Sequence, residues 1–138
     1  MAFPAIILLD TNIASFAIRG QSPTLNAWLQ RAPLPRLCIS AITEAELRYG
    51  VALNPAAKGL AYDVTNFLRR VESLPWDSDA AECYGRLRAE LRKAGTPLDA
   101  MDLLIAAHAL SLGALLITND QSFTRVKGLH LADWTKTD

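Results

Sequence analysis

Short apolar runs and stretches of helically spaced apolar residues alternate along this chain. Continuous apolar runs are typical of strands covered on both faces, and they occur at 6–9, 36–40, 114–118 and 129–132. Apolar residues at helical spacing predict helices that begin at Ser22, Thr43 and Asp77 or Ser78, with others over 60–71 and 102–112. This alternation predicts a three-layer α/β/α domain with a mostly parallel central sheet.

The length of 138 residues suits a single domain, and we expect that domain to span residues 1–138. Hydrophobic residues make up 51% of the chain and charged residues 20%, a composition that excludes a disordered protein. No repeat, low-complexity segment or interdomain linker interrupts the pattern.

The formal net charge is zero, with 14 basic and 14 acidic residues, so a general nucleic-acid coating protein is excluded. A nuclease is still compatible with this balance, because local arginines that hold phosphates can cancel an acidic site. The candidates for such contacts are Arg69, Arg70, Arg86, Arg88, Arg92 and Lys93, although solvated helix faces account for most of them.

The two cysteines, Cys38 and Cys83, have no metal-binding spacing and are expected to be small core residues. The first strand begins without a basic region or cleavage site of a secretory leader. The longest apolar stretch, 103–117, is shorter than the ~20 residues that span a bilayer. We therefore expect a cytoplasmic protein that does not enter a membrane.

Carboxylates occur where predicted elements begin or end. Asp10 follows the first strand, Asp120 follows the strand at 114–118, and Asp102 opens an apolar helix. Parallel sheets bind ligands at the carboxyl ends of their strands, and clustered carboxylates repel one another unless a cation lies between them. Together with Glu46, these acids predict a site for Mg²⁺ or Mn²⁺, because both ions prefer hard oxygen ligands.

Each acid also has a purely structural explanation, and the sequence leaves these alternatives open. Asp10 and Asp120 are typical of helix caps and turns. Thr43 and Glu46 match a capping box, in which the glutamate reaches back to the cap. Asp99 and Asp102 can simply favour the positive end of a helix dipole. Glu44 lies two positions from Glu46 and is expected to point elsewhere.

Other site chemistries find little support in the residues. His108 and His130 are expected to be satisfied structural histidines, and no Ser-His-Asp set or glycine-rich phosphate loop is present. A receiver domain needs an acidic pair after the first strand, where Thr11 and Asn12 stand instead. Asn12 also excludes a phosphatase of the Asp-x-Asp type.

Four segments, taken in order and spacing, resemble the successive motifs of PIN-domain nucleases, and above all the VapC-like toxins of bacterial toxin–antitoxin pairs. These segments are Leu8–Asn12, Ile39–Gly50, Asp102–Ala109 and Ile117–Asp120. The resemblance implies a PIN-like fold and a metal-dependent endoribonuclease that hydrolyses RNA phosphodiester bonds. The alternatives are a PIN-like nuclease of RNA processing and a non-catalytic interaction domain.

The resemblance also implies the roles of individual residues. The metal ligands and catalytic acids become Asp10, Glu46, Asp102 and Asp120, with Asp99 as a further catalytic acid and Thr118 and Asn12 as accessory residues. The implied partners are RNA, a second copy in a homodimer, and a cognate antitoxin. We expect a helix of the antitoxin to pack on apolar surface near Trp28 or Leu47, and a cation from its tail to reach the acids.

Overall fold

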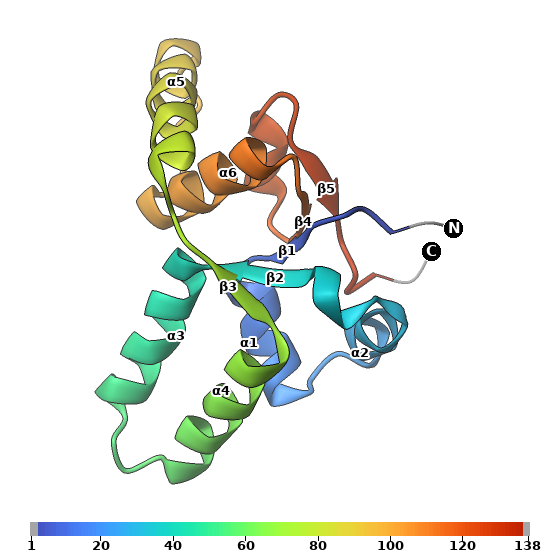
Figure 1. Cartoon of the computed structure of the whole chain (residues 1–138). Helices are drawn as coiled ribbons and strands as arrows, with labels where there is room; N and C mark the ends of the chain where they lie inside the picture. Colours follow the sequence, from blue (N-terminus) through green and yellow to red (C-terminus); the bar gives the residue numbers. More distant parts are fainter. Residues whose placement is uncertain (1–2, 137–138) are drawn as a thin grey trace.

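Five parallel strands form the centre of the computed structural model, which describes residues 3–136 (Figure 1). The order across the sheet is β3-β2-β1-β4-β5. The strands are β1 (Ile7–Leu9), β2 (Leu37–Ser40), β3 (Glu72–Leu74), β4 (Leu115–Ile117) and β5 (His130–Ala132). Every neighbouring pair is parallel, which confirms the prediction of a mostly parallel sheet.

Helices cover both faces of this sheet, so the predicted three-layer architecture is confirmed (Figure 1). One face is covered by α5 (Ser78–Ala94) and α6 (Ala100–Leu112). The other is covered by α1 (Thr11–Arg19), α2 (Pro23–Arg31), α3 (Ala41–Leu53) and α4 (Lys58–Arg70). Two short 3₁₀ helices, η1 (Leu34–Arg36) and η2 (Gln121–Arg125), complete the fold.

The central strand β1 shows how the sequence forms two cores. Its side chains alternate between the faces of the sheet, as in any strand. Leu8 packs into the core beneath α5 and α6, whereas Ile7 and Leu9 pack into the core beneath the other four helices. All three are fully buried, which explains why the strand is a continuous apolar run instead of an alternating pattern.

Two elements differ from the sequence prediction. The edge strand β3 was not predicted, because its three residues Glu72–Leu74 include no apolar run and none of them is fully buried. The helix α1 was not predicted either, because it starts directly at Thr11 with no loop after the first strand. Asp10 ends that strand and caps this helix at once.

The start of α3 also corrects a prediction. The helix begins at Ala41, two residues before the expected Thr43, because the Ser40 hydroxyl accepts a hydrogen bond from the Ile42 amide at 3.1 Å. Thr43 is fully buried within the helix. Since Thr43 is not the cap, the capping-box explanation of Glu46 is wrong.

The helix ends agree with the sequence more closely. Asp77 caps α5, while Gly95 and Gly113 end α5 and α6 in the left-handed region with φ of 71° and 61°. Cys38 is buried in the core and Cys83 is half-buried against it, as expected of small core residues, and both are free thiols. Within residues 3–136, no helix has the length and apolarity needed to cross a membrane.

The side chains of Trp28 and Leu47, near which the antitoxin helix is expected to bind, are themselves partly or fully covered. Leu47 is buried. Trp28 stacks on Trp134 with ring centroids 5.3 Å apart, and the Arg31 guanidinium lies 4.1 Å from its ring centroid. Large apolar side chains are instead exposed at Tyr49, Leu53, Tyr62 and Leu34.

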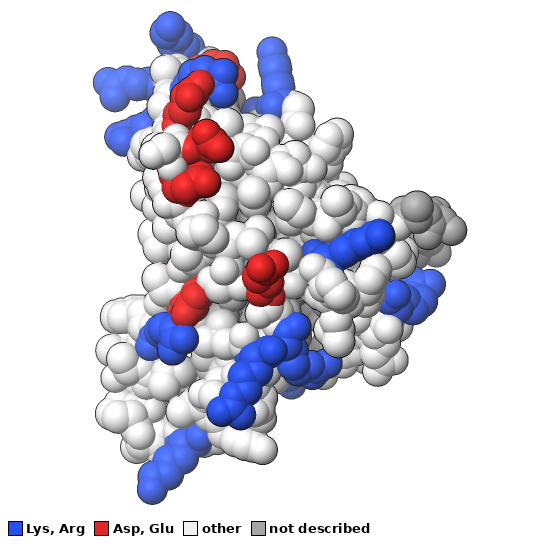
Figure 2. Space-filling model, viewed as in Figure 1, with Lys and Arg blue, Asp and Glu red and all other residues white. Residues whose placement is uncertain are grey.

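Charged side chains are unevenly spread over the face drawn in Figure 2. Basic side chains gather at the upper end of the molecule, where α5 ends, and acidic ones lie below them along the same helix. Further basic groups surround the lower helices. The overall neutrality of the chain therefore conceals local regions of both signs.

Candidate active site

The carboxyl ends of β1 and β4 bring the first and last acidic motifs together. Leu9 is in register with Ile117, and the Asp10 amide donates a hydrogen bond to the Ile117 carbonyl at 3.1 Å. Asp10 and Thr118 therefore leave adjacent strands at one edge of the sheet. Both are buried, with exposed fractions of 3% and 5%.

Asp10 has a structural role in addition to its place among the acids. Its Oδ1 accepts a hydrogen bond from the Ile13 amide at 2.8 Å and so caps α1. Burial raises the pKa of Asp10, hydrogen bonds from Thr118 and Ile13 lower it, and the charges of Asp120 and Glu46 raise it again. The cap predicted as an alternative is thus real, and it fixes the carboxylate beside other acids.

Asp102 is the acid most affected by its neighbours. Burial raises its pKa to about 6, and the charges of Asp120, Asp99, Asp10 and Glu46 add to this rise in decreasing order. Because electrostatic effects of this kind require proximity, the fold has gathered all five predicted acids. Asp102 lies in the first turn of α6, as the sequence indicated.

Glu46 is held by Thr11, which in turn contacts Thr43, and the sequence did not predict either hydrogen bond. The Thr11 hydroxyl donates to Glu46 Oε1 at 2.6 Å, and the hydroxyls of Thr11 and Thr43 lie 3.1 Å apart. Glu44 instead pairs with Arg48 at 2.7 Å, and hydrogen bonds from Ser73 and Arg48 lower the pKa of Glu44. The two glutamates therefore have different surroundings, as expected.

The remaining predicted acids and Asn12 are more accessible than Asp10 and Thr118, since Asp120 is half-buried and Asp99 and Asn12 are exposed. Asp120 Oδ1 accepts from the Ser122 amide at 2.9 Å, and Thr118 Oγ1 accepts from the Asp120 amide at 3.0 Å. Asp99 is exposed at the N-cap position of α6, where its side chain makes no capping hydrogen bond. Asn12 is exposed in the first turn of α1.

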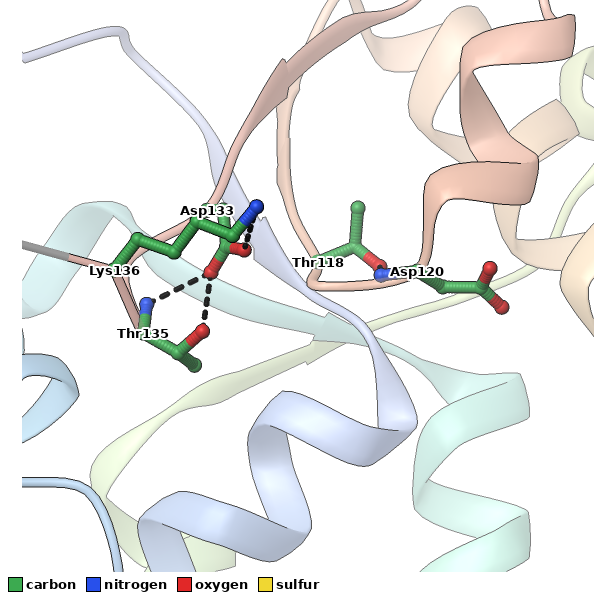
Figure 3. Close-up of polar contacts among 5 residues, drawn as sticks. All are labelled: Thr118, Asp120, Asp133, Thr135 and Lys136. Carbon is green, nitrogen blue, oxygen red and sulfur yellow. Dashed lines mark hydrogen bonds and ion pairs between the residues drawn. The ribbon is translucent and has the colours of Figure 1, made fainter.

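A further carboxylate, Asp133, follows β5 at the same edge but does not join this group. Its Oδ1 accepts from the Thr135 amide at 2.8 Å and from the Thr135 hydroxyl, and its Oδ2 lies 3.9 Å from Lys136 Nζ. In Figure 3, Asp120 points away from this set of residues. Asp133 therefore belongs to a local turn.

His108 is a structural residue, as the sequence indicated. It is buried, and its Nδ1 lies 2.8 Å from Oγ of Ser40, the residue that caps α3. Burial lowers the pKa of His108, although Asp77 and a hydrogen bond with the Pro75 backbone act in the opposite direction. This histidine thus connects α6 to the end of β2.

The donor chemistry of the acids fits a hard divalent cation. Among residues 3–136, no three acidic, histidine or cysteine side chains form a group that can hold a metal ion as they stand. The acids nevertheless offer the oxygen ligands that Mg²⁺ and Mn²⁺ prefer. A cation among them would also relieve the repulsion that raises the pKa of Asp102.

Comparisons with known proteins agree with the fold and the motifs. The PIN-domain family model matches residues 7–129. The tRNA(fMet)-specific endonuclease VapC of Salmonella typhimurium is 38% identical, over 92% of this chain and 96% of its own length.

Solved structures give the same picture. The DNA-bound VapBC structure from Salmonella typhimurium has a TM-score of 0.88 at 36% identity, over 95% of this chain and 99% of that chain. VapBC-5 from Mycobacterium tuberculosis, a member of the VapBC family of toxin-antitoxin systems, has a TM-score of 0.73 at 29% identity, over 94% and 99%. The chain therefore belongs to the PIN-domain family and, within it, to the VapC group.

Proposed function

We propose that this protein is a metal-dependent endoribonuclease that acts as the toxin of a toxin–antitoxin pair. The main observation is that Asp10, Glu46, Asp99 and Asp120 all lie near enough to Asp102 for their charges to add to the effect of burial, which raises the pKa of Asp102 to about 6. A surface that used these acids only as caps has no need to place them so close together. The names of the relatives support RNA as the substrate and a toxin–antitoxin system as the setting.

Four acids would hold Mg²⁺ or Mn²⁺, namely Asp10, Glu46, Asp102 and Asp120. When bound, the ion would lower the pKa of a water molecule and stabilise negative charge on the phosphate during in-line attack. Asp10 is fixed for this task by its cap to Ile13, and Glu46 by Thr11. Asp99 is exposed and makes no capping bond, so it is our candidate for accepting the proton of the attacking water.

The antitoxin would bind the exposed apolar side chains of α3 and α4. Tyr49, Leu53 and Tyr62 are each more than half exposed, and a groove of about 200 Å³ lies between these helices. The three exposed side chains do not line this groove, whose apolar lining includes Val51, Ala61 and Val64, and an amphipathic helix would lay its apolar face into it. The groove includes Arg48 and Val51, neighbours of Leu47 on α3, and so lies close to one of the two places expected for the antitoxin, near Trp28 or Leu47.

Cleavage assays test the proposed activity directly. Purified protein is incubated with structured RNA in Mg²⁺ or Mn²⁺ and in a chelator, with Asp10→Asn as the matched variant. We expect cleavage only with metal, and none from the variant, whose fold is checked by circular dichroism. Full cleavage by folded Asp10→Asn would reduce Asp10 to a helix cap and contradict the mechanism. Absence of cleavage by metal-loaded wild-type protein on every RNA tested favours a non-catalytic domain.

A further inference from the structure

A pocket of about 320 Å³ lies between α5 and α6, apart from the carboxylates themselves. One wall is a single face of α5, with Tyr84, Arg88 and Arg92 at intervals of four residues. The opposite wall consists of Leu98, Ala100 and Leu103. The volume of the pocket lies at the lower end of the range for small-molecule sites.

The segment that holds Asp99 and Asp102 also contributes to this pocket, although neither acid lines it. Leu98 and Ala100 flank Asp99, and Leu103 directly follows Asp102. Arg125 approaches the same segment, since its Nη1 donates to the Pro97 carbonyl at 2.7 Å. Arg125 of η2 therefore contacts the segment that presents Asp99, and Arg88 and Arg92 of α5 line the same pocket as that segment.

The basic side chains of the pocket are suited to a polyanion. Arg88 donates to the Tyr84 hydroxyl at 3.0 Å, and its guanidinium carbon lies 5.9 Å from the Tyr84 ring centroid. Within the described part of the chain, neither Arg88 nor Arg92 forms an ion pair. Guanidinium groups stay charged at all physiological pH values and bind phosphate through two parallel hydrogen bonds.

We propose that this pocket is a subsite for one nucleotide of the RNA strand, adjacent to the phosphate that is cleaved. Arg88 and Arg92 bind the phosphate of that nucleotide, while Tyr84 and the apolar wall contact its base, as aromatic side chains do with unpaired bases. The inference rests on the proposed ribonuclease function. It explains how a neutral protein with an acidic centre retains a polyanionic substrate.

The pocket distinguishes the four basic residues of α5 by whether they line it, a distinction that the sequence could not make. Arg88 and Arg92 line the pocket, whereas Arg86 and Lys93 are exposed on α5 and do not. Arg86 instead lies 3.6 Å from the Cys83 sulfur. The two residues outside the pocket are therefore matched controls, of the same charge and on the same helix.

Binding can be measured separately from cleavage. A fluorescent single-stranded oligoribonucleotide is titrated with Asp10→Asn protein, in which cleavage is blocked, and anisotropy is recorded. Adding Arg88→Ala or Arg92→Ala is expected to weaken RNA binding about tenfold and to reduce the dependence on salt. Adding Arg86→Ala or Lys93→Ala should change the affinity less than about twofold. A failure of the catalytic proposal leaves this binding measurement unaffected.

Tyr84 separates base contacts from phosphate contacts. Tyr84→Leu removes the ring and should weaken RNA binding about threefold or more, whereas Tyr84→Phe keeps the ring, loses only the hydroxyl that accepts from Arg88, and should weaken binding less than Tyr84→Leu. In a cleavage-competent background, Arg92→Ala should raise KM and leave kcat unchanged. RNA affinities that are equal for all four arginine and lysine variants overturn the subsite. The subsite is also overturned if the Arg88 and Arg92 variants lose self-association or antitoxin binding but keep RNA binding, because the pocket is then a protein interface.

Discussion

The Thr11 hydroxyl donates a 2.6 Å hydrogen bond to Glu46 Oε1, and it joins the first residue of α1 to the second turn of α3. A carboxylate can only accept, so the single hydroxyl proton of Thr11 is used in this bond. Thr43 must then donate to Thr11 across their 3.1 Å contact. The result is a directed chain from Thr43 through Thr11 to Glu46, which leaves Oε2 of Glu46 outside this chain.

Removing the hydroxyl of Thr11 should leave the Glu46 side chain less well positioned, without creating a cavity in the core. Thr11→Val keeps the size of the side chain but deprives Glu46 of its donor and Thr43 of its acceptor. We expect Mn²⁺ affinity, measured by calorimetry, to fall several-fold, and the free energy of unfolding to fall by about 1 kcal/mol.

Thr11→Ser is the matched control for this change, because it retains the hydroxyl, and it should restore most of the metal affinity. If Thr11→Val binds Mn²⁺ as tightly as the wild type, the hydrogen bond does not position Glu46 for metal.

Glu46→Gln separates the charge of Glu46 from its shape. Glutamine still accepts a hydrogen bond from Thr11, so the thermal midpoint should stay close to that of the wild type. Metal affinity and RNA cleavage should be lost, because a neutral amide is a poor ligand for a hard cation. Glu44→Gln is the control, since Glu44 pairs with Arg48, and it should keep most of the activity. A fully active Glu46→Gln protein leaves Glu46 with a structural role alone.

The antitoxin surface is tested by substitutions at exposed aromatic residues. Tyr49→Ser and Tyr62→Ser remove large apolar side chains from α3 and α4, where loss of solvent-exposed area costs the fold little. Each should reduce the amount of antitoxin that co-purifies after co-expression, and the double variant should nearly abolish it. Leu34→Ser, at an exposed apolar position on η1, should have no effect. If all these variants co-purify the same amount of antitoxin as the wild type, the antitoxin binds a different surface of the protein.

Local sequence signals were sufficient for much of the fold and for the acids. The run that ends at Asp10 and the run at 114–118 both identify buried strands, because strands covered on two faces are apolar throughout. Their parallel pairing then predicts that Asp10 and Asp120 meet at one edge. The acid positions therefore follow from pattern and topology, and their motif spacing agrees with the family.

Contacts between residues far apart in the sequence could not be predicted from local sequence patterns. Ser40 looked like the end of a strand, and only the structure shows that it also caps α3. The bond between Thr11 and Glu46 joins residues 35 positions apart, and no local periodicity encodes it. Leu47 lies on a helix whose buried face depends on where α1 and α4 pack. Its burial could not be inferred from spacing alone.

Asp102 gives the protein a pH dependence of defined sign. Its pKa rises from an ordinary value of 3.8 to about 6 in the folded state, so between these values the folded protein binds more protons than the unfolded one. Stability due to this group is therefore greatest at low pH and is lost as the pH rises through about 6. The full shift corresponds to about 3 kcal/mol, which we reduce to about 1 kcal/mol because Asp102 is only half-buried.

In the metal-free protein, Asp102→Asn should remove the destabilisation that ionised Asp102 causes near neutral pH. Urea unfolding in chelator should show the variant about 1 kcal/mol more stable than the wild type near neutral pH, and nearly equal to it near pH 4, where Asp102 is protonated. Added Mg²⁺ should then stabilise the wild type and not the variant, because only the wild type retains the full set of acids. Parallel pH profiles for the two proteins contradict the electrostatic account of the site, whatever the outcome of the cleavage assays.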